Sequence, residues 1–102
     1  MYVIYGWDEA EFRCVPCLKA KRMAELKKGQ WKGFDFEFKP IPKSDPQHPN
    51  RLELEQHLTD MGVELKTLPQ VFVHYGADLA LIGGFDEFKK HVKSIDSAMW
   101  EK

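Results

Sequence analysis

The hydrophobic and polar positions of the chain change period several times, and each change marks a predicted element. Residues 2–5 form a short apolar run that is typical of a buried strand. A polar loop over residues 6–13 leads to good helix formers from about 15 to 28, with Gly29 as the expected stop. Small apolar residues recur there at helical spacing and predict one buried face. They are Cys17, Ala20, Met23 and Ala24.

The middle of the chain predicts a second strand and a second helix. Residues 34–39 alternate phenylalanine with charged residues, which is typical of a strand with one wetter face at a sheet edge. Prolines between residues 40 and 49 mark a loop. Asn50 followed by Glu53 resembles a capping box and predicts a helix that ends at Gly62. Its apolar face carries Leu54, Leu58 and Met61.

The last third of the chain predicts two adjacent strands and a helix. The apolar runs 71–73 and 79–82 are continuous, so both strands are expected to be covered on both faces. The short turn between them favours a hairpin. Asp86 and Glu87 then start a helix, because acidic residues complement the helix dipole there. Its apolar positions are Phe88, Val92, Ile95 and Met99, and Trp100 is expected to pack back on the domain.

The predicted order is β-α-β-α-β-β-α, which is the minimal thioredoxin fold of the α/β class. The first three elements should form a right-handed parallel unit. We therefore expect a four-stranded mixed sheet flanked by helices on both faces. At 102 residues, 1–102 is expected to be a single domain.

Charge and hydropathy exclude several classes of protein. The 15 basic and 16 acidic residues give a net charge of −1, which argues against non-specific nucleic-acid binding. No apolar run approaches the roughly 18 residues of a membrane span. The opening Met-Tyr-Val-Ile-Tyr lacks the basic region of a secretory signal. We therefore expect a cytoplasmic protein without a membrane or nucleic-acid partner.

The chain has two cysteines, Cys14 and Cys17, at the junction of a loop and a predicted helix. In a reducing compartment such a pair is usually catalytic, redox-sensing or metal-binding. Unpaired N–H groups, the helix dipole and the Arg13 cation should lower the pKa of the Cys14 thiol from about 8.5. Cys17 remains within reach to form a disulfide. Pro16 is tolerated in the first turn, where N–H groups lack helical partners.

Two other interpretations of the cysteines are a buried structural pair and a zinc site. Free cysteines are often simply buried in a core. A zinc site needs two more ligands, yet there is no second cysteine pair and no two histidines have ligand spacing. The histidines are His48, His57, His74 and His91. A redox pair is therefore favoured over a metal site.

Three motifs occur in the order found in one family. They are Cys14-Val-Pro-Cys17, Thr67-Leu-Pro69 and Ile82-Gly-Gly-Phe-Asp86. Together, over about residues 1–93, they resemble glutaredoxin. The long loop before the cysteines, with Ala20-Lys-Arg22 and Pro69-Gln-Val-Phe72, is most similar to the glutaredoxins of T-even-type bacteriophages.

The resemblance implies a dithiol disulfide oxidoreductase with glutathione as cosubstrate and no tightly bound cofactor. It implies a monomer that reduces protein disulfides, such as that of ribonucleotide reductase, in the host cytoplasm if the gene is a phage gene. One alternative is a thioredoxin-like electron donor reduced by thioredoxin reductase. Another is a metal or iron–sulfur carrier, although such glutaredoxins usually have one active cysteine with small neighbours.

The resemblance also assigns roles to residues near the glutathione backbone. It implies a cis bond between Leu68 and Pro69, with the Leu68 backbone pairing with the cysteinyl unit of glutathione. Gly83 and Gly84 would allow close approach of the backbone. Asp86 would meet the γ-glutamyl end, unless it is simply a helix N-cap. Glu87 is the other candidate for that contact.

Cations and aromatic residues complete the expected site. Arg13 is the best candidate for the glycyl carboxylate of glutathione. Three further cations are weaker candidates that could equally form a solvated helix face: Lys19, Lys21 and Arg22. Trp7 and Tyr5 are candidates to line the groove, and Tyr5 is equally a core candidate.

The order Val15-Pro16 departs from the usual dithiol glutaredoxin, which has proline directly after the first cysteine. Proline before the second cysteine is the order of thioredoxins. We therefore hypothesise a redox potential shifted toward thioredoxin, from about −200 to −230 mV toward about −270 mV.

Overall fold

The computed structural model describes residues 1–31 and 33–100, with side chains described as far as Ile95. The expectations for Met99 and Trp100 therefore lie outside the described side chains. The elements follow the predicted order. The strands are β1 (Tyr2–Trp7), β2 (Phe36–Ile41), β3 (Gln70–Tyr75) and β4 (Asp78–Gly83), and the helices are α1 (Val15–Gln30), α2 (Pro49–Asp60) and α3 (Phe85–Trp100).

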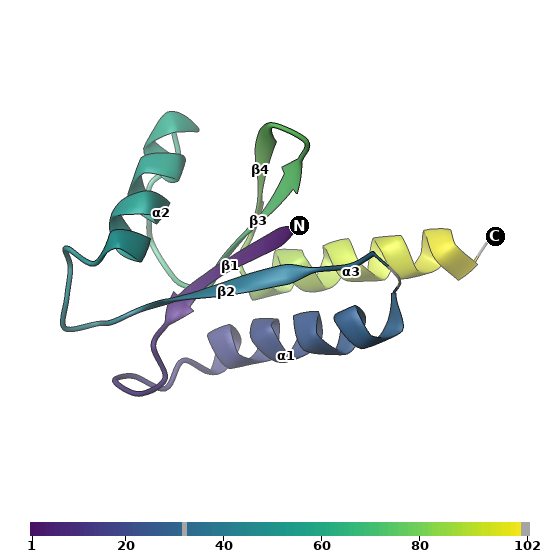
Figure 1. Ribbon diagram of the computed structural model, residues 1–102, viewed down its shortest axis with the longest axis horizontal. Helices are drawn as coiled ribbons and strands as arrows, with labels where there is room; N and C mark the ends of the chain where they lie inside the picture. Colours follow the sequence, from purple (N-terminus) through teal and green to yellow (C-terminus); the bar gives the residue numbers. More distant parts are fainter. Residues whose placement is uncertain (32, 101–102) are drawn as a thin grey trace.

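The four strands form one mixed sheet in the order β2-β1-β3-β4. β1 and β2 are parallel, with Tyr2 opposite Phe36, whereas β3 is antiparallel to both β1 and β4. Helices α1 and α3 lie on one face of the sheet and α2 lies on the other (Figure 1). The predicted thioredoxin-type α/β fold is therefore confirmed.

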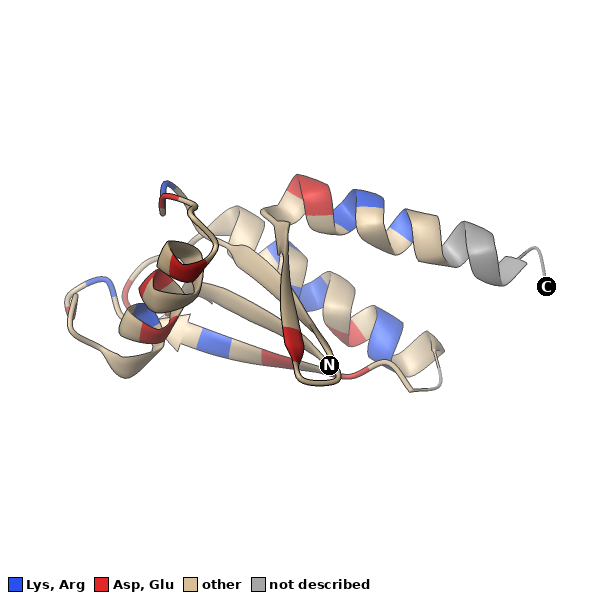
Figure 2. Ribbon diagram, turned by 90° about the horizontal axis from the view of Figure 1, so that it is seen from above, with Lys and Arg blue, Asp and Glu red and all other residues tan. Residues whose placement is uncertain are grey.

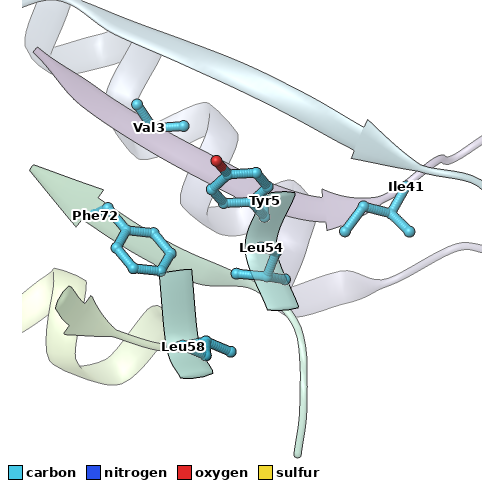
Figure 3. Close-up of a cluster of buried hydrophobic side chains, with 6 residues drawn as sticks. All are labelled: Val3, Tyr5, Ile41, Leu54, Leu58 and Phe72. Atoms are coloured by element: carbon cyan, nitrogen blue, oxygen red, sulfur yellow. The ribbon is translucent and has the colours of Figure 1, made fainter. Parts of the chain in front are cut away.

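Alternate residues of β1 point into two separate cores, as the strand pleat requires. Val3 and Tyr5 face α2, in a cluster with Leu54, Leu58 and Phe72 (Figure 3). Ile4 is packed on the opposite face, against a second cluster. That cluster includes Ala20, Ala24, Val71, Phe88 and Val92. The central strand is thus fixed from both sides.

The two apolar runs of the hairpin differ in burial. Residues 71–73 of β3 are all buried, as predicted for a strand covered on both faces. Residues 79–83 of β4 are only partly buried, so the same prediction was wrong for that strand. The reason is its position, since β4 is the outer strand of the sheet and has a neighbour on one side only.

β2 lies at the opposite edge, as its alternating pattern predicted, and it includes Pro40, which was expected to lie in a loop. The Asp8 N–H donates to the Ile41 carbonyl, so Ile41 directs its main-chain groups toward β1. Pro40 therefore faces outward, where the missing N–H breaks no ladder bond. Its carbonyl accepts a 2.8 Å hydrogen bond from Asn50 Nδ2.

The start of α2 differs from the predicted capping box. His48 is the N-cap, and its Nδ1 accepts a 3.1 Å hydrogen bond from the Asn50 N–H. Pro49 occupies the first turn, where it is favoured. Glu53 bonds to Tyr5 and Lys39 and so does not complete a capping box. The helix ends before Gly62, whose φ of 71° supports the predicted stop.

None of the helices described is long and apolar enough to cross a bilayer. Figure 2 shows Lys and Arg distributed along α1, whereas α3 begins with acidic residues and continues with basic ones. The acidic first turn of α3, at Asp86 and Glu87, agrees with the expected complement to the helix dipole.

Candidate active site

The two cysteines lie at the N-terminus of α1, as predicted. Cys14 is the N-cap, and its Sγ accepts a 3.2 Å hydrogen bond from the Cys17 N–H. The two residues form a disulfide with a Cα–Cα distance of 5.2 Å. Pro16 occupies the first turn without breaking the helix. An N–H group directed at Sγ stabilises negative charge there, which is the requirement for a thiolate nucleophile.

The two sulfurs differ in accessibility. Cys14, at the N-cap, is 7% exposed, whereas Cys17, inside the first turn of α1, is 1% exposed. Cys17 packs against Gly6, where an added Cβ would lie 3.1 Å from Cys17 Cβ and 2.9 Å from the Phe38 ring. Gly6 is therefore required for this packing. The sequence reading missed this role, and the only available signal was a glycine just after the apolar run of the first strand.

The segment before β3 faces the cysteines. The Leu68–Pro69 peptide bond is cis, as the resemblance implied. The Leu68 carbonyl oxygen lies 3.8 Å from Cys14 Sγ. Among the residues that the structure describes, none accepts a hydrogen bond from the Leu68 N–H. Leu68 thus presents an unpaired main-chain donor beside the redox pair.

The two glycines after β4 have different environments. Gly83 has a φ of 126°, and an added Cβ would lie 3.0 Å from the Glu87 side chain. Gly84 would meet its nearest neighbours only at 3.7 Å, at the Pro69 carbonyl. Gly83 therefore makes room for Glu87, whereas Gly84 makes room in front of Pro69. Since α3 begins at Phe85, Asp86 lies inside the first turn, and the alternative of an N-cap was wrong.

Two grooves meet beside Cys14, at Pro16 and Leu68. The first, which we call the α3 groove, has a volume of about 600 Å³. Its lining includes Leu68, Pro69, Gly84 and Asp86. Lys19 and Lys89 also line it, against the acidic Asp86 and Glu87. Its charged groups are therefore balanced in sign.

The second groove, which we call the α2 groove, is larger, at about 720 Å³. It lies between the start of α1, the loop before Cys14, and α2. Its apolar lining includes Trp7, Phe12, Val15, Ile41 and Leu65. Its charged lining residues are Arg13, Arg51, Lys66 and Glu55. Three of these are basic and one is acidic, so this groove favours anions.

The predicted site residues are thus divided between the grooves. Arg13 and Trp7 line the α2 groove, and Lys19 lines the α3 groove. Lys21 instead lies 3.8 Å from Glu9, and neither it nor Arg22 lines a groove. Tyr5 is buried in the core, so the core reading of that residue was the correct one.

Several groove residues were missed by sequence reasoning. Phe12, Arg51, Glu55 and Lys66 come from three segments that only the fold brings together. Arg51 and Glu55 are four residues apart on α2 and form a 2.8 Å ion pair, a spacing that the sequence does show. No described cluster of three or more His, Cys, Asp or Glu side chains could hold a metal ion.

Curated glutaredoxins match the chain over most of its length. The glutaredoxin of Enterobacteria phage T4 is 32% identical over 96 residues, which cover 91% of this chain and 100% of that relative. The chain belongs to the glutaredoxin family. The glutaredoxin of Haemophilus influenzae is 30% identical over 80 residues, which cover 78% of this chain and 80% of the relative. No protein-family profile matches the chain.

The fold gives an independent comparison. The solved structure of reduced Escherichia coli glutaredoxin superposes with a TM-score of 0.63 and 27% sequence identity. The match covers 91% of this chain and 93% of that structure. With Cys14 and Cys17 paired at a helix N-terminus, the family relationship identifies this glutaredoxin as a thiol–disulfide oxidoreductase.

Proposed function

We propose that the chain is a glutathione-dependent dithiol oxidoreductase that reduces protein disulfides. The observation that carries this proposal is the position of Cys14. Its sulfur caps α1 and lies 3.8 Å from the Leu68 carbonyl, and Cys14 lines the α2 groove close to the point where the α3 groove meets it. A disulfide sulfur placed there would have a nucleophile beside it and a peptide edge to pair with.

The reaction needs the two cysteines in sequence. The Cys14 thiolate attacks one sulfur of the substrate disulfide, forms a mixed disulfide and displaces the other sulfur as a thiolate. Cys17 then attacks Cys14 Sγ, which breaks the mixed disulfide and releases the second substrate thiol. The protein disulfide formed is the state seen in the structure. Two glutathione thiols then restore the dithiol and leave as oxidised glutathione.

The two grooves suggest how glutathione would lie. The cysteinyl unit would pair with the free N–H of Leu68. The γ-glutamyl end carries an ammonium and a carboxylate, and the α3 groove offers both signs of charge through Asp86, Glu87 and Lys19. The glycyl carboxylate would then enter the more basic α2 groove, toward Arg13. No tightly bound cofactor is required by this scheme.

The resemblance points to ribonucleotide reductase as the first protein disulfide to test. It also makes thioredoxin reductase a candidate reductant, because Pro16 stands where thioredoxins have their proline. These two partners define the second candidate function, a thioredoxin-like electron donor that binds glutathione poorly.

The test compares Cys14→Ser and Cys17→Ser on a glutathione mixed disulfide and on a protein disulfide. We expect Cys14→Ser to lose both activities, because it removes the nucleophile. We expect Cys17→Ser to retain the glutathione reaction and lose the protein one. Turnover of the wild type with glutathione and glutathione reductase is compared with turnover by thioredoxin reductase.

The outcomes separate the candidates. Turnover with thioredoxin reductase alone would support the thioredoxin-like donor and contradict the glutathione-dependent one. Full activity of Cys14→Ser would contradict both. A purified protein with bound zinc or a visible iron–sulfur absorption band would instead support a carrier.

A further inference from the structure

The α2 groove is larger and more apolar than the glycyl end of glutathione requires. Its volume of about 720 Å³ lies in the range of clefts that hold drug-sized ligands, about 300 to 1,000 Å³. Two of its apolar residues are unusually open to solvent, with Phe12 38% and Val15 48% exposed. Exposed apolar side chains on both sides of a reactive cysteine are typical of a contact surface.

A basic and aromatic cluster lies at one wall of this groove. The rings of Trp7 and Phe12 meet edge to face, with centroids 6.0 Å apart. Lys43 Nζ lies 4.0 Å from the centre of the Phe12 ring and 5.8 Å from that of Trp7. These contacts hold the Lys43 cation over two rings that line the groove, and none of the ion pairs described gives it an acidic partner. The wall therefore offers apolar contact and positive charge together.

The direction of a bound chain follows from the proposed pairing with Leu68. In glutathione the glycine follows the cysteine, and it would point into the α2 groove. A polypeptide that paired with Leu68 in the same direction would place the residues after its cysteine in that groove. The residues before its cysteine would lie toward the α3 groove.

We propose that the α2 groove binds the segment that follows the target cysteine of a protein substrate. It selects segments in which apolar and acidic residues come directly after that cysteine. The apolar contact comes from Trp7, Phe12 and Val15. The positive charge comes from Lys43 and Lys66. This inference rests on the proposed function. It adds which residues the substrate carries after its target cysteine and the direction in which the bound polypeptide runs.

The experiment uses two peptides whose single cysteine carries a thionitrobenzoate group through a disulfide. In one, Leu-Glu-Glu follows the cysteine, and in the other, Glu-Glu-Leu precedes it. The reduced dithiol of the protein supplies two electrons to the disulfide of each peptide. Its reduction releases the peptide as a free thiol, together with one coloured thionitrobenzoate. The same derivative of glutathione is the reference substrate. We expect kcat/KM to be about tenfold higher for the first peptide than for the second.

Two variants test the wall of the groove. Phe12→Ser and Lys43→Glu should each lower the ratio of first-peptide to glutathione kcat/KM by about five- to tenfold. Lys43 is exposed, so its variant should fold even if Phe12→Ser does not. The matched controls are Leu26→Ser and Lys90→Glu, which are exposed on α1 and α3 and line neither groove. Both controls should keep the wild-type ratio.

The outcomes distinguish this inference from the proposed function. If neither the glutathione derivative nor the peptides react, the proposed function fails. If glutathione reacts but the two peptides have equal kcat/KM, or the second is preferred, the inference is overturned. An unchanged ratio in a folded Lys43→Glu protein would overturn it as well.

Discussion

At the scale of single residues, a polar cluster fixes α2 to the sheet. The Tyr5 hydroxyl donates to Glu53 Oε1, which also accepts a 2.6 Å bond from Lys39 Nζ. Burial first, and then the Glu53 carboxylate, raises the pKa of Tyr5 above its usual range. Burial alone would raise the pKa of Glu53, but the bonds from Lys39 and Tyr5 outweigh it and lower that pKa. The charged form of Glu53 is therefore the one that stabilises the fold.

Replacement of this carboxylate should give a pH-dependent loss of stability. Since the folded pKa of Glu53 is depressed, its contribution is present above about pH 4.3 and is lost as the pH falls through the folded pKa. At pH 7 we expect Glu53→Gln to lower the free energy of unfolding by about 1 kcal/mol, because Glu53 is partly exposed and screened. The difference from wild type should shrink as the pH falls below about 4.3 and through the depressed pKa of folded Glu53.

Urea unfolding followed at several pH values measures this effect. The matched control is Glu55→Gln, which removes an i,i+4 pair with Arg51 on the same helix and should cost about 0.5 kcal/mol or less. Equal losses for the two variants at pH 7 would contradict a special role for Glu53.

At the scale of elements, the ends of helices were harder to predict than the helices themselves. Periodic apolar positions predicted α1 correctly, because its buried face depends on residues within the helix. Its end did not follow Gly29, which was expected to stop it. The helix continues to Gln30, and the Trp31 N–H bonds to the Lys27 carbonyl. A glycine permits a left-handed stop but does not impose one.

The helical position of Gly29 makes a stability prediction. Nothing lies within 4 Å of an added Cβ, and the residue has no positive φ. Gly29→Ala should therefore raise the free energy of unfolding by about 0.5 kcal/mol, since alanine loses less backbone entropy in a helix. Gly62→Ala, at a φ of 71°, is the matched control and should destabilise. A destabilised Gly29→Ala protein would show that this end of α1 is not helical in solution.

At the scale of the whole molecule, the active site joins segments that are distant in sequence. The cysteine pair could be predicted, because its chemistry depends on two residues and a helix start. The cis bond at Pro69 came from the resemblance, since no local pattern requires it. The division into two grooves could not be predicted, because Phe12, Arg51 and Lys66 meet only when α2 packs on the sheet. Long-range packing of this kind leaves no period in the sequence.

The redox potential is a property of the whole site and tests the order Val15-Pro16. We expect a value more negative than about −220 mV by equilibration with a glutathione buffer. Exchange of the two residues, Val15→Pro with Pro16→Val, should restore the usual glutaredoxin order and raise the potential by about 30 mV. A wild-type potential above about −220 mV would refute the hypothesis.

The outer edge of β2 affects how readily the protein aggregates at high concentration. An exposed strand edge is a template on which another chain can add a strand and begin to aggregate. Here Pro40 has no N–H to offer, and Asn50 already occupies its carbonyl. An incoming strand would find neither main-chain group of Pro40 free to pair, near the C-terminal end of β2. One proline and one side-chain amide therefore shorten the stretch of this edge on which another chain could add a strand.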